Sequence, residues 1–177
     1  MYPVLRLIKE QVKFRHLTLD LFATHVSHHI CWPWDIDPWM ELNNGRTLTL
    51  FDLGRMPLTS AIGINRALMR HRWGMAVAGA SVRYRRRIRA FHRFEMRSRL
   101  LGWDRRFFYV EQTMWRKGEA LNHVLIRLAA TDENGILAPE RLVEALGQAR
   151  LRSPALPGWV TAWAEADALR PWPPMQG

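Results

Sequence analysis

The spacing of apolar positions predicts a helix at the start of the chain. From Val4 to Phe14 the apolar residues recur at helical spacing and basic residues occupy other parts of the wheel, which predicts a short basic amphipathic helix. We expect this helix to pack on the domain or on a partner subunit, in preference to peripheral contact with a membrane. Residues 24–34 then predict a strand, and residues 33–42 predict an irregular turn.

A longer apolar surface follows this turn. Asn43 or Asn44 can cap a helix, and the apolar positions within residues 45–72 are typical of a long helix buried on one side. Pro57 and Gly63 interrupt the pattern, so we expect a kink or a break, with a looser second segment beyond it.

Over residues 73–131 apolar and polar residues alternate one by one, and this pattern predicts about four antiparallel strands. One of these strands is expected to carry arginines on one face and apolar residues on the other. The arginines are Arg83, Arg85, Arg87 and Arg89, and the apolar positions are Val82, Tyr84 and Ile88. Hairpin turns are expected at residues 102–104 and 117–119.

Helices are expected again near the end of the chain. Residues 132–135 close the sheet region, Pro139 begins a helix, a second short helix follows Pro157, and the tail at residues 171–174 is irregular. The order of strand, long helix and strands predicts an α+β fold. In this fold a curved antiparallel sheet wraps around one central helix, and extra helices lie at both ends.

The length and composition fit one soluble domain. The chain has 177 residues and a mass of 20.8 kDa, which is the usual size of a single domain. We expect the core of this domain at about 24–131, an N-terminal amphipathic extension over 1–23, and a C-terminal helical extension and tail over 136–177. One cysteine excludes a disulfide framework, and the lack of a long apolar run or secretory pattern predicts a cytoplasmic protein. The net charge of +10 favours anionic partners: nucleic acid, an acidic membrane or the phosphates of coenzyme A.

The histidines and the cysteine do not predict a metal site. His25 and His29 would share a strand face but lie about 13 Å apart at 3.3 Å per residue, and His28 would point to the opposite face. We therefore expect surface or interface histidines, no metal and no other cofactor. Cys31 has no evident base beside it, and we expect a buried structural thiol.

The turn before the long helix carries the candidate chemistry. Asp35 and Asp37 lie between a strand and a helix start, where free backbone N–H groups and the positive end of the helix dipole favour negative charge. A carboxylate facing such an oxyanion site suits acyl transfer. Because Asp-Pro turns before capped helices are common, a purely structural role for this turn stays open.

Several segments resemble the hotdog-fold acyl-CoA thioesterases of the 4-hydroxybenzoyl-CoA thioesterase type. The segments are the Asp-x-Asp-Pro turn, the Asn-Asn pair that enters the helix, Phe51-Asp52-Leu53-Gly54-Arg55, Gly79–Arg86 and Gly102–Tyr109. The resemblance covers roughly residues 24–131. It implies a hotdog fold, an acyl-CoA substrate with coenzyme A as its carrier, and a homodimer or tetramer with each acyl tunnel at a subunit interface.

The resemblance also implies roles for individual residues. Asp37 matches the catalytic aspartate, and the backbone N–H of Asn44 matches the donor that polarises the thioester carbonyl, while Asp35 supports the turn. Glu41 stands where many members carry histidine, and Thr47, where many carry an aromatic residue, is a predicted substrate contact. Glu41 is one candidate second acid.

Asp52 is the other candidate second acid, because related enzymes use an acidic residue from this helix. We favour an ion pair of Asp52 with Arg55 as the explanation for this carboxylate.

The arginines suggest a second part of the site. Arg83, Arg85 and Arg87 are predicted to bind coenzyme A phosphates, although a solvated sheet edge would carry the same residues. Nucleic acid is disfavoured, because single-strand binders interleave exposed aromatic side chains with basic ones, and Tyr84 is expected to face inward.

These observations predict an acyl-CoA thioesterase, with Asp37 as nucleophile or general base. The alternatives are a non-catalytic hotdog module that binds acyl-CoA or RNA and, less favoured, a hotdog hydratase or dehydratase.

Overall fold

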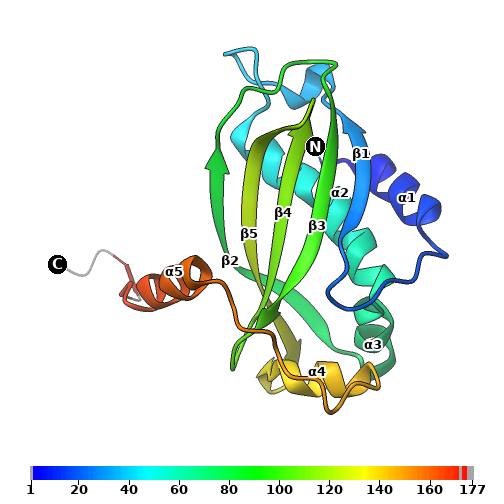
Figure 1. Cartoon of the computed structure of the whole chain (residues 1–177), viewed down its shortest axis with the longest axis vertical. Coiled ribbons are helices and arrows are strands. Elements are labelled where there is room, and N and C mark those ends of the chain that lie inside the picture. Colours follow the sequence, from blue (N-terminus) through cyan, green and yellow to red (C-terminus); the bar gives the residue numbers. More distant parts are fainter. Residues whose placement is uncertain (1, 172, 175–177) are drawn as a thin grey trace.

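A curved antiparallel sheet wraps around helix α2 (Asn44–Ala61) in the computed structural model, which describes residues 2–171, 173 and 174 (Figure 1). The strand order is β1-β3-β4-β5-β2, and the short strand β6 pairs with the C-terminal end of β5. The strands are β1 (His25–Ile30), β2 (Gly74–Tyr84), β3 (Arg93–Trp103), β4 (Phe108–Arg116), β5 (Glu119–Asp132) and β6 (Gly135–Leu137). All neighbouring strands pair antiparallel, which confirms the expected α+β architecture.

Helix α2 forms the centre of the core. Leu50, Phe51 and Leu53 on this helix are fully buried. Gly54 allows the helix to approach β3 closely, because a Cβ atom at this position would lie 2.5 Å from the sulfur of Met96. The close contact fixes α2 against the concave face of the sheet and thereby fixes where its first turn lies.

The expected break in the long helix is confirmed. Pro57 lies inside α2 without ending it, and the helix stops at Ala61. Gly63 follows in a left-handed conformation at φ 85°, which glycine adopts without strain, and α3 (Ile64–His71) begins directly after it. The second segment is therefore a regular helix and is not the looser stretch expected.

The predicted arginine strand is wrong beyond Tyr84. Strand β2 ends there, and residues 85–92 form a loop, so Arg85, Arg87 and Arg89 do not share a strand face with Arg83. The loop turns inward at Ile88, which is 1% exposed. The carbonyl of Ile88 accepts a hydrogen bond from the Leu42 N–H at 2.7 Å. The alternation of arginines reflects this loop and not a strand.

Of the two predicted hairpin turns, one is shifted along the chain and the other is confirmed. The turn expected at 102–104 lies further on, because Gly102 and Trp103 still belong to β3 and the carboxylate of Asp104 accepts hydrogen bonds from the N–H groups of Arg106 and Phe107. The turn at Lys117 and Gly118 is confirmed between β4 and β5.

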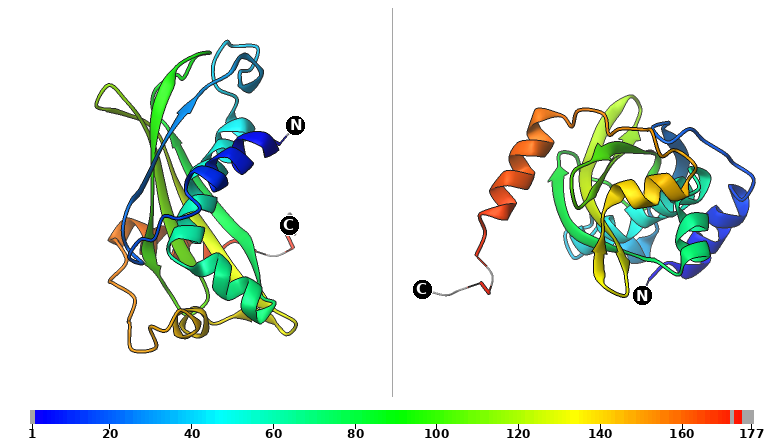
Figure 2. Two further views of the ribbon diagram at one scale, coloured as in Figure 1. Left: turned by 90° about the vertical axis from the view of Figure 1, so that its right-hand side faces the viewer. Right: turned by 90° about the horizontal axis from the view of Figure 1, so that it is seen from below.

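The terminal helices lie on different sides of the sheet. Helix α1 (Val4–Lys13) packs beside α2 on the helical side, and α4 (Pro139–Ala145) closes one end (Figure 2). Helix α5 (Gly158–Ala168) projects from the side near β5, to which Asp167 is joined by an ion pair with Arg127 at 2.5 Å. In the expected tail, Pro171, Pro173 and Pro174 are irregular, whereas Trp172 and residues 175–177 lie outside the described residues.

Candidate active site

The segment from Ile36 to Leu42 folds back on itself and presents the carboxylate of Asp37. Ile36 and Leu42 form an isolated antiparallel bridge, and the Asp37 N–H donates to the carbonyl of Glu41 at 2.8 Å. Oδ1 of Asp37 accepts from the Trp39 N–H at 2.9 Å and from the Glu41 N–H at 3.4 Å. Within the described part of the chain no donor is bonded to Oδ2. One oxygen thus holds the turn, and the second is open to a reaction.

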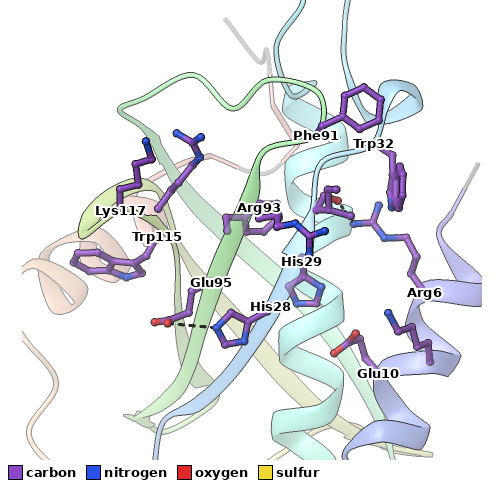
Figure 3. Close-up of a pocket in the computed structure, with 14 residues that line it drawn as sticks. Arg6, Glu10, His28, His29, Trp32, Phe91, Arg93, Glu95, Trp115 and Lys117 are labelled. Atoms are coloured by element: carbon purple, nitrogen blue, oxygen red, sulfur yellow. Dashed lines mark hydrogen bonds and ion pairs between the residues drawn. The ribbon is translucent and has the colours of Figure 1, made fainter.

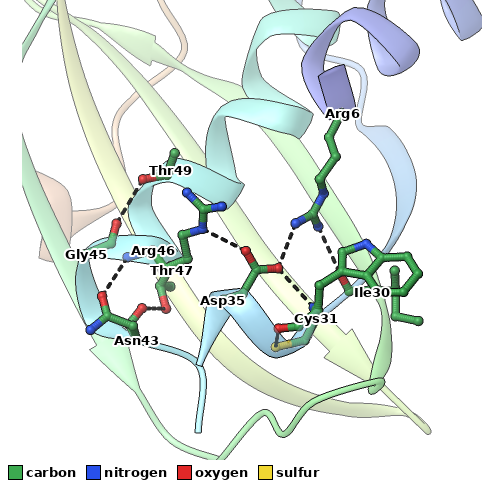
Figure 4. Close-up of polar contacts among 10 residues, drawn as sticks. Arg6, Ile30, Cys31, Asp35, Asn43, Gly45, Arg46, Thr47 and Thr49 are labelled. Carbon is green, nitrogen blue, oxygen red and sulfur yellow. Dashed lines mark hydrogen bonds and ion pairs between the residues drawn. The ribbon is translucent and has the colours of Figure 1, made fainter. Parts of the chain in front are cut away.

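Asp35 joins this turn to the rest of the fold. Its carboxylate is fully buried and accepts from Arg6 and Arg46 at 2.7 Å each and from the Trp32 N–H at 3.0 Å (Figure 4). Its backbone carbonyl also accepts from the Asn43 N–H at 3.0 Å. The expected supporting role of Asp35 is therefore confirmed, since it connects α1, the turn and the start of α2.

The electrostatic state of Asp35 follows from these contacts. Burial alone would raise the pKa of its carboxyl. The hydrogen bond from the Trp32 backbone and the two arginines outweigh burial, so the pKa lies below its ordinary value of 3.8. Asp35 is therefore held as a carboxylate, and because every contact to it is structural, it is unsuited to attack a substrate.

The start of α2 supplies the candidate oxyanion donor. Asn43 caps the helix, with its side-chain oxygen accepting from the Arg46 N–H at 3.1 Å. Asn44 is the first helical residue and is exposed, and among the described residues no acceptor is bonded to its backbone N–H. This N–H therefore lies at the positive end of the helix dipole, where an oxyanion is stabilised.

A small hollow of about 230 Å³ opens beside this helix start, and we call it the Asn44 hollow. Its polar lining residues are Glu41, Asn44, Tyr84, Arg85, Arg86, Arg87 and Asn122. The structure thus brings together the Asn44 donor, the Glu41 carboxylate and two of the three predicted phosphate ligands, Arg85 and Arg87. Arg83 and Asp37 do not line this hollow.

The charges of the Asn44 hollow are partly paired. Nε of Arg87 lies 3.0 Å from a carboxylate oxygen of Glu41. The candidate second acid Glu41 is therefore part of an ion pair. Arg85 forms no ion pair within the described residues, so its guanidinium is available to an anion. The hollow is basic overall, which suits a phosphate-bearing ligand.

Three lining residues were not predicted as part of the site. The hydroxyl of Tyr84 donates to the Asn44 carbonyl at 3.3 Å and is exposed, so the expected inward position of Tyr84 is wrong. Asn122 on β5 is 4% exposed, and its side-chain oxygen has no partner among the described residues. Arg86 pairs with Glu119 at 2.5 Å. Tyr84 and Arg86 lie in the family-like segment Gly79–Arg86, whereas no local motif marks Asn122, and only the fold brings the three residues to α2.

Two further predicted residues lie away from the Asn44 hollow. Thr47 is fully buried, its hydroxyl donates to the Asn43 carbonyl at 3.1 Å in the first turn of α2, and it does not line the Asn44 hollow. Asp52 accepts a hydrogen bond from the Tyr2 hydroxyl at 2.8 Å and pairs with Arg55, which confirms the favoured ion pair.

Two of the three histidines expected at a surface or interface are buried within the chain, and His28 is exposed as expected. His25 and His29 share the inner face of β1 and are buried, whereas His28 is exposed on the other face. Burial lowers the pKa of His25 to about 4 and that of His29 to about 3, so both are neutral. Cys31 is a buried thiol, as expected, and burial raises its pKa to about 11. The described residues contain no group of three or more His, Cys, Asp or Glu side chains that would hold a metal ion.

A larger hollow of about 870 Å³, which we call the α1 hollow, lies at the other edge of the sheet (Figure 3). Residues of α1, β1, β3 and the β4–β5 turn line it, and none of the predicted site residues does.

The sequence of the chain is similar to those of known proteins. Residues 31–164 match the thioesterase-like superfamily. The protein THEM6 of Xenopus laevis is 30% identical over 158 residues, which cover 89% of this chain and 75% of the relative.

Solved structures share the fold. The probable thioesterase YbaW of Escherichia coli superposes with a TM-score of 0.65 at 19% identity, over 70% of this chain and 97% of the other. A Staphylococcus aureus protein, SAV2348, solved in complex with CoA, gives 0.60 at 9% identity, over 81% and 95%. Because the superfamily match covers more than half of the chain, and the sheet-wrapped helix is the hotdog fold, the chain belongs to the thioesterase-like superfamily.

Proposed function

We propose that the protein hydrolyses an acyl-CoA thioester to a free acid and coenzyme A. The observation that carries this proposal is the unbonded backbone N–H of Asn44, which begins α2 beside a basic hollow and directly after the Asp37 turn. Membership of the thioesterase-like superfamily supports thioester hydrolysis as the reaction type. The structurally similar S. aureus protein was solved with bound CoA, which supports coenzyme A as the acyl carrier.

The proposed chemistry assigns one step to each group. The Asn44 N–H donates to the thioester carbonyl oxygen as that oxygen gains negative charge. The carbonyl carbon is attacked either by the Asp37 carboxylate, which gives a mixed anhydride that water then opens, or by a water molecule that gives its proton to Asp37. On both routes the carbon–sulfur bond breaks, coenzyme A leaves as a thiolate that takes up a proton, and the acid is released.

An assay of the purified protein tests this proposal directly. Thiol release would be followed with acyl-CoA substrates of increasing chain length and with an aromatic acyl-CoA. We expect turnover of at least one member of the panel above the rate in buffer. Binding of acyl-CoA without thiol release would support the non-catalytic module, and hydration of an unsaturated acyl-CoA would support the hydratase alternative.

The Asn44 hollow is the proposed site for coenzyme A phosphates. Replacing Arg85 and Arg87 together with Gln should raise KM for an acyl-CoA at least about tenfold, because charge-assisted hydrogen bonds to phosphate are removed. Turnover of a short thioester without phosphates should change little. Arg105→Gln, in the exposed turn after β3, is the matched control. Equal losses on both substrates would show that these arginines serve the fold.

Asn122 is proposed to contact the substrate in the same hollow. Its buried side-chain oxygen is an acceptor without a donor among the described residues, and such a group costs free energy unless a ligand or water bonds to it. A hydroxyl or amide N–H of the substrate would satisfy it.

We also propose that the protein is a homodimer joined through β2. This strand is an outer member of the sheet, pairs only with β5 among the described strands, and exposes more than half of Val77. At the opposite outer strand, Arg6 of α1 donates to the carbonyl of Ile30 at 2.8 Å. An open edge such as that of β2 is a liability unless another strand covers it, and pairing with a copy would place the Asp37 turn near the partner chain.

The expected mass in light scattering is about twice the chain mass of 20.8 kDa. Val77→Glu should weaken self-association by at least about tenfold, because a charged side chain on an edge strand opposes pairing with another strand. Val26→Glu, on the outer strand β1, should leave the mass unchanged. A wild-type mass of 20.8 kDa would reject the dimer.

A further inference from the structure

Helix α1 is oriented with its apolar side toward solvent. Leu5 is 83% exposed, and Val4, Ile8 and Val12 are each more than half exposed. At 3.6 residues per turn these four positions form one stripe about 100° wide. The side that faces the protein body carries Leu7 among the polar residues Arg6, Glu10 and Gln11, so most of the apolar surface of α1 points away from the core.

Polar contacts hold the helix in this orientation. Arg6 donates to the Asp35 carboxylate at 2.7 Å and to the Ile30 carbonyl at 2.8 Å. Glu10 is 4% exposed, and the side chain of Gln11 accepts from the Ser60 hydroxyl at 3.2 Å. Rotation of α1 to bury its apolar stripe would break the Arg6 ion pair and leave Asp35 with one arginine fewer. The stripe is therefore a fixed part of the surface.

The charge beside the apolar stripe has one sign. Lys9 and Lys13 are exposed on the flank of the helix, whereas its single acid, Glu10, faces inward. Burial also raises the pKa of Glu10, which favours its neutral form. Basic residues predominate in the α1 hollow, which Lys9, Arg93, Arg116 and Lys117 line together with the acid Glu95. Arg93, Glu95 and Lys117 can be followed in Figure 3. The surface thus combines exposed apolar side chains with a surplus of cations.

We propose that α1 docks the protein on an anionic lipid bilayer. Leu5, Ile8 and their neighbours would enter the boundary between headgroups and acyl chains, and Lys9 and Lys13 would contact lipid phosphates. The ten-residue helix would lie in the surface, and no helix in the described part of the chain is long and apolar enough to cross a membrane. Helix α1 packs on the domain as expected from the sequence, but its apolar stripe faces away from the domain and is left for the membrane.

A second copy of the chain fits this surface less well. A symmetric contact would place the same patch on both sides of the interface, so that Lys9 and Lys13 would face their own copies without acids between them. An anionic bilayer complements these charges, and its apolar layer covers the stripe.

Co-sedimentation with vesicles tests the proposal independently of any catalytic activity. We expect the wild-type protein to sediment with vesicles of mixed phosphatidylcholine and phosphatidylglycerol, and much less with phosphatidylcholine alone. The double variant Leu5→Ser/Ile8→Ser should lower vesicle partitioning at least about tenfold, as should Lys9→Gln/Lys13→Gln. Met69→Ser removes an equally exposed apolar side chain from α3 and should partition like the wild type.

Other outcomes would overturn the proposal. These are a wild-type protein that stays in the supernatant with both vesicle types, or partitioning that survives Leu5→Ser/Ile8→Ser. Sedimentation velocity without lipid gives a second measurement. If Leu5→Ser/Ile8→Ser lowers the oligomeric state and vesicles bind neither protein, a second copy covers α1. The variants replace exposed side chains, and their unfolding midpoints should equal that of the wild type.

Discussion

Replacing Asp37 by Asn is expected to lower thioester turnover at least about 100-fold, the scale on which a positioned catalytic group acts. The amide cannot attack the carbonyl carbon or take a proton from water. It can still accept the hydrogen bond from the Trp39 N–H through its oxygen, so the turn should keep its shape. The loss should therefore appear in kcat, and the unfolding midpoint should stay close to that of the wild type.

A matched control separates catalysis from turn geometry. Asp132 also accepts a backbone N–H two residues later, from Asn134 at 2.8 Å, but it lies at the β5–β6 turn. Asp132→Asn should leave turnover almost unchanged. If a folded Asp37→Asn protein hydrolyses thioesters at a near-normal rate, the proposed role of Asp37 is wrong. Rates should be measured at saturating substrate so that changes in binding do not hide the result.

The architecture could be predicted from the sequence because each main element carries its own local signal. The apolar stripe and the Asn43 cap predict α2, Gly63 predicts its separation from α3, and the turn at Gly118 predicts the β4–β5 hairpin. The failures lie where local alternation and tertiary contacts disagree. Arg85 and Arg87 alternate as strand residues do, yet the chain leaves the sheet after Tyr84 so that Ile88 can enter the core.

The candidate site divides in a similar way. The Asp-x-Asp turn and the helix start are contiguous in sequence, and the supporting role of Asp35 is implied by the family resemblance of this turn. The contact of Glu41 with Arg87 joins two segments through the fold, and Asn122 reaches the hollow only because β5 pairs with β2. Such neighbours depend on strand order, which periodicity does not reveal.

The orientation of α1 shows the same limit. Periodicity identifies an amphipathic helix but assumes that the apolar side faces the core. Here Arg6 pairs with Asp35, 29 positions away, and most of the apolar residues of the helix face solvent. The segment that fixes the helix is the same turn that presents Asp37, so the stability of the turn and the attachment of α1 depend on one carboxylate.

Replacing Asp35 by Ala is therefore expected to destabilise the protein by about 3 kcal/mol, because it leaves the largely buried Arg6 and Arg46 without the carboxylate that both contact. Urea unfolding at neutral pH measures the difference. Glu119→Ala is the control, since its ion pair with Arg86 is more than half exposed on both sides and should contribute at most about 1 kcal/mol. A loss for Asp35→Ala no larger than that of the control would contradict the connecting role of Asp35.

The same variant has a predicted pH dependence. The pKa of Asp35 is lower in the folded protein than its ordinary value of 3.8, so the unfolded chain binds the proton more readily. The stabilisation by Asp35 is therefore complete above that value and is lost as the pH falls through the lower, folded pKa. The gap in unfolding free energy between wild type and Asp35→Ala should be constant near neutral pH and should close in acid. A gap that stays constant into acid would show that packing, and not the charge of Asp35, holds α1 and the turn together.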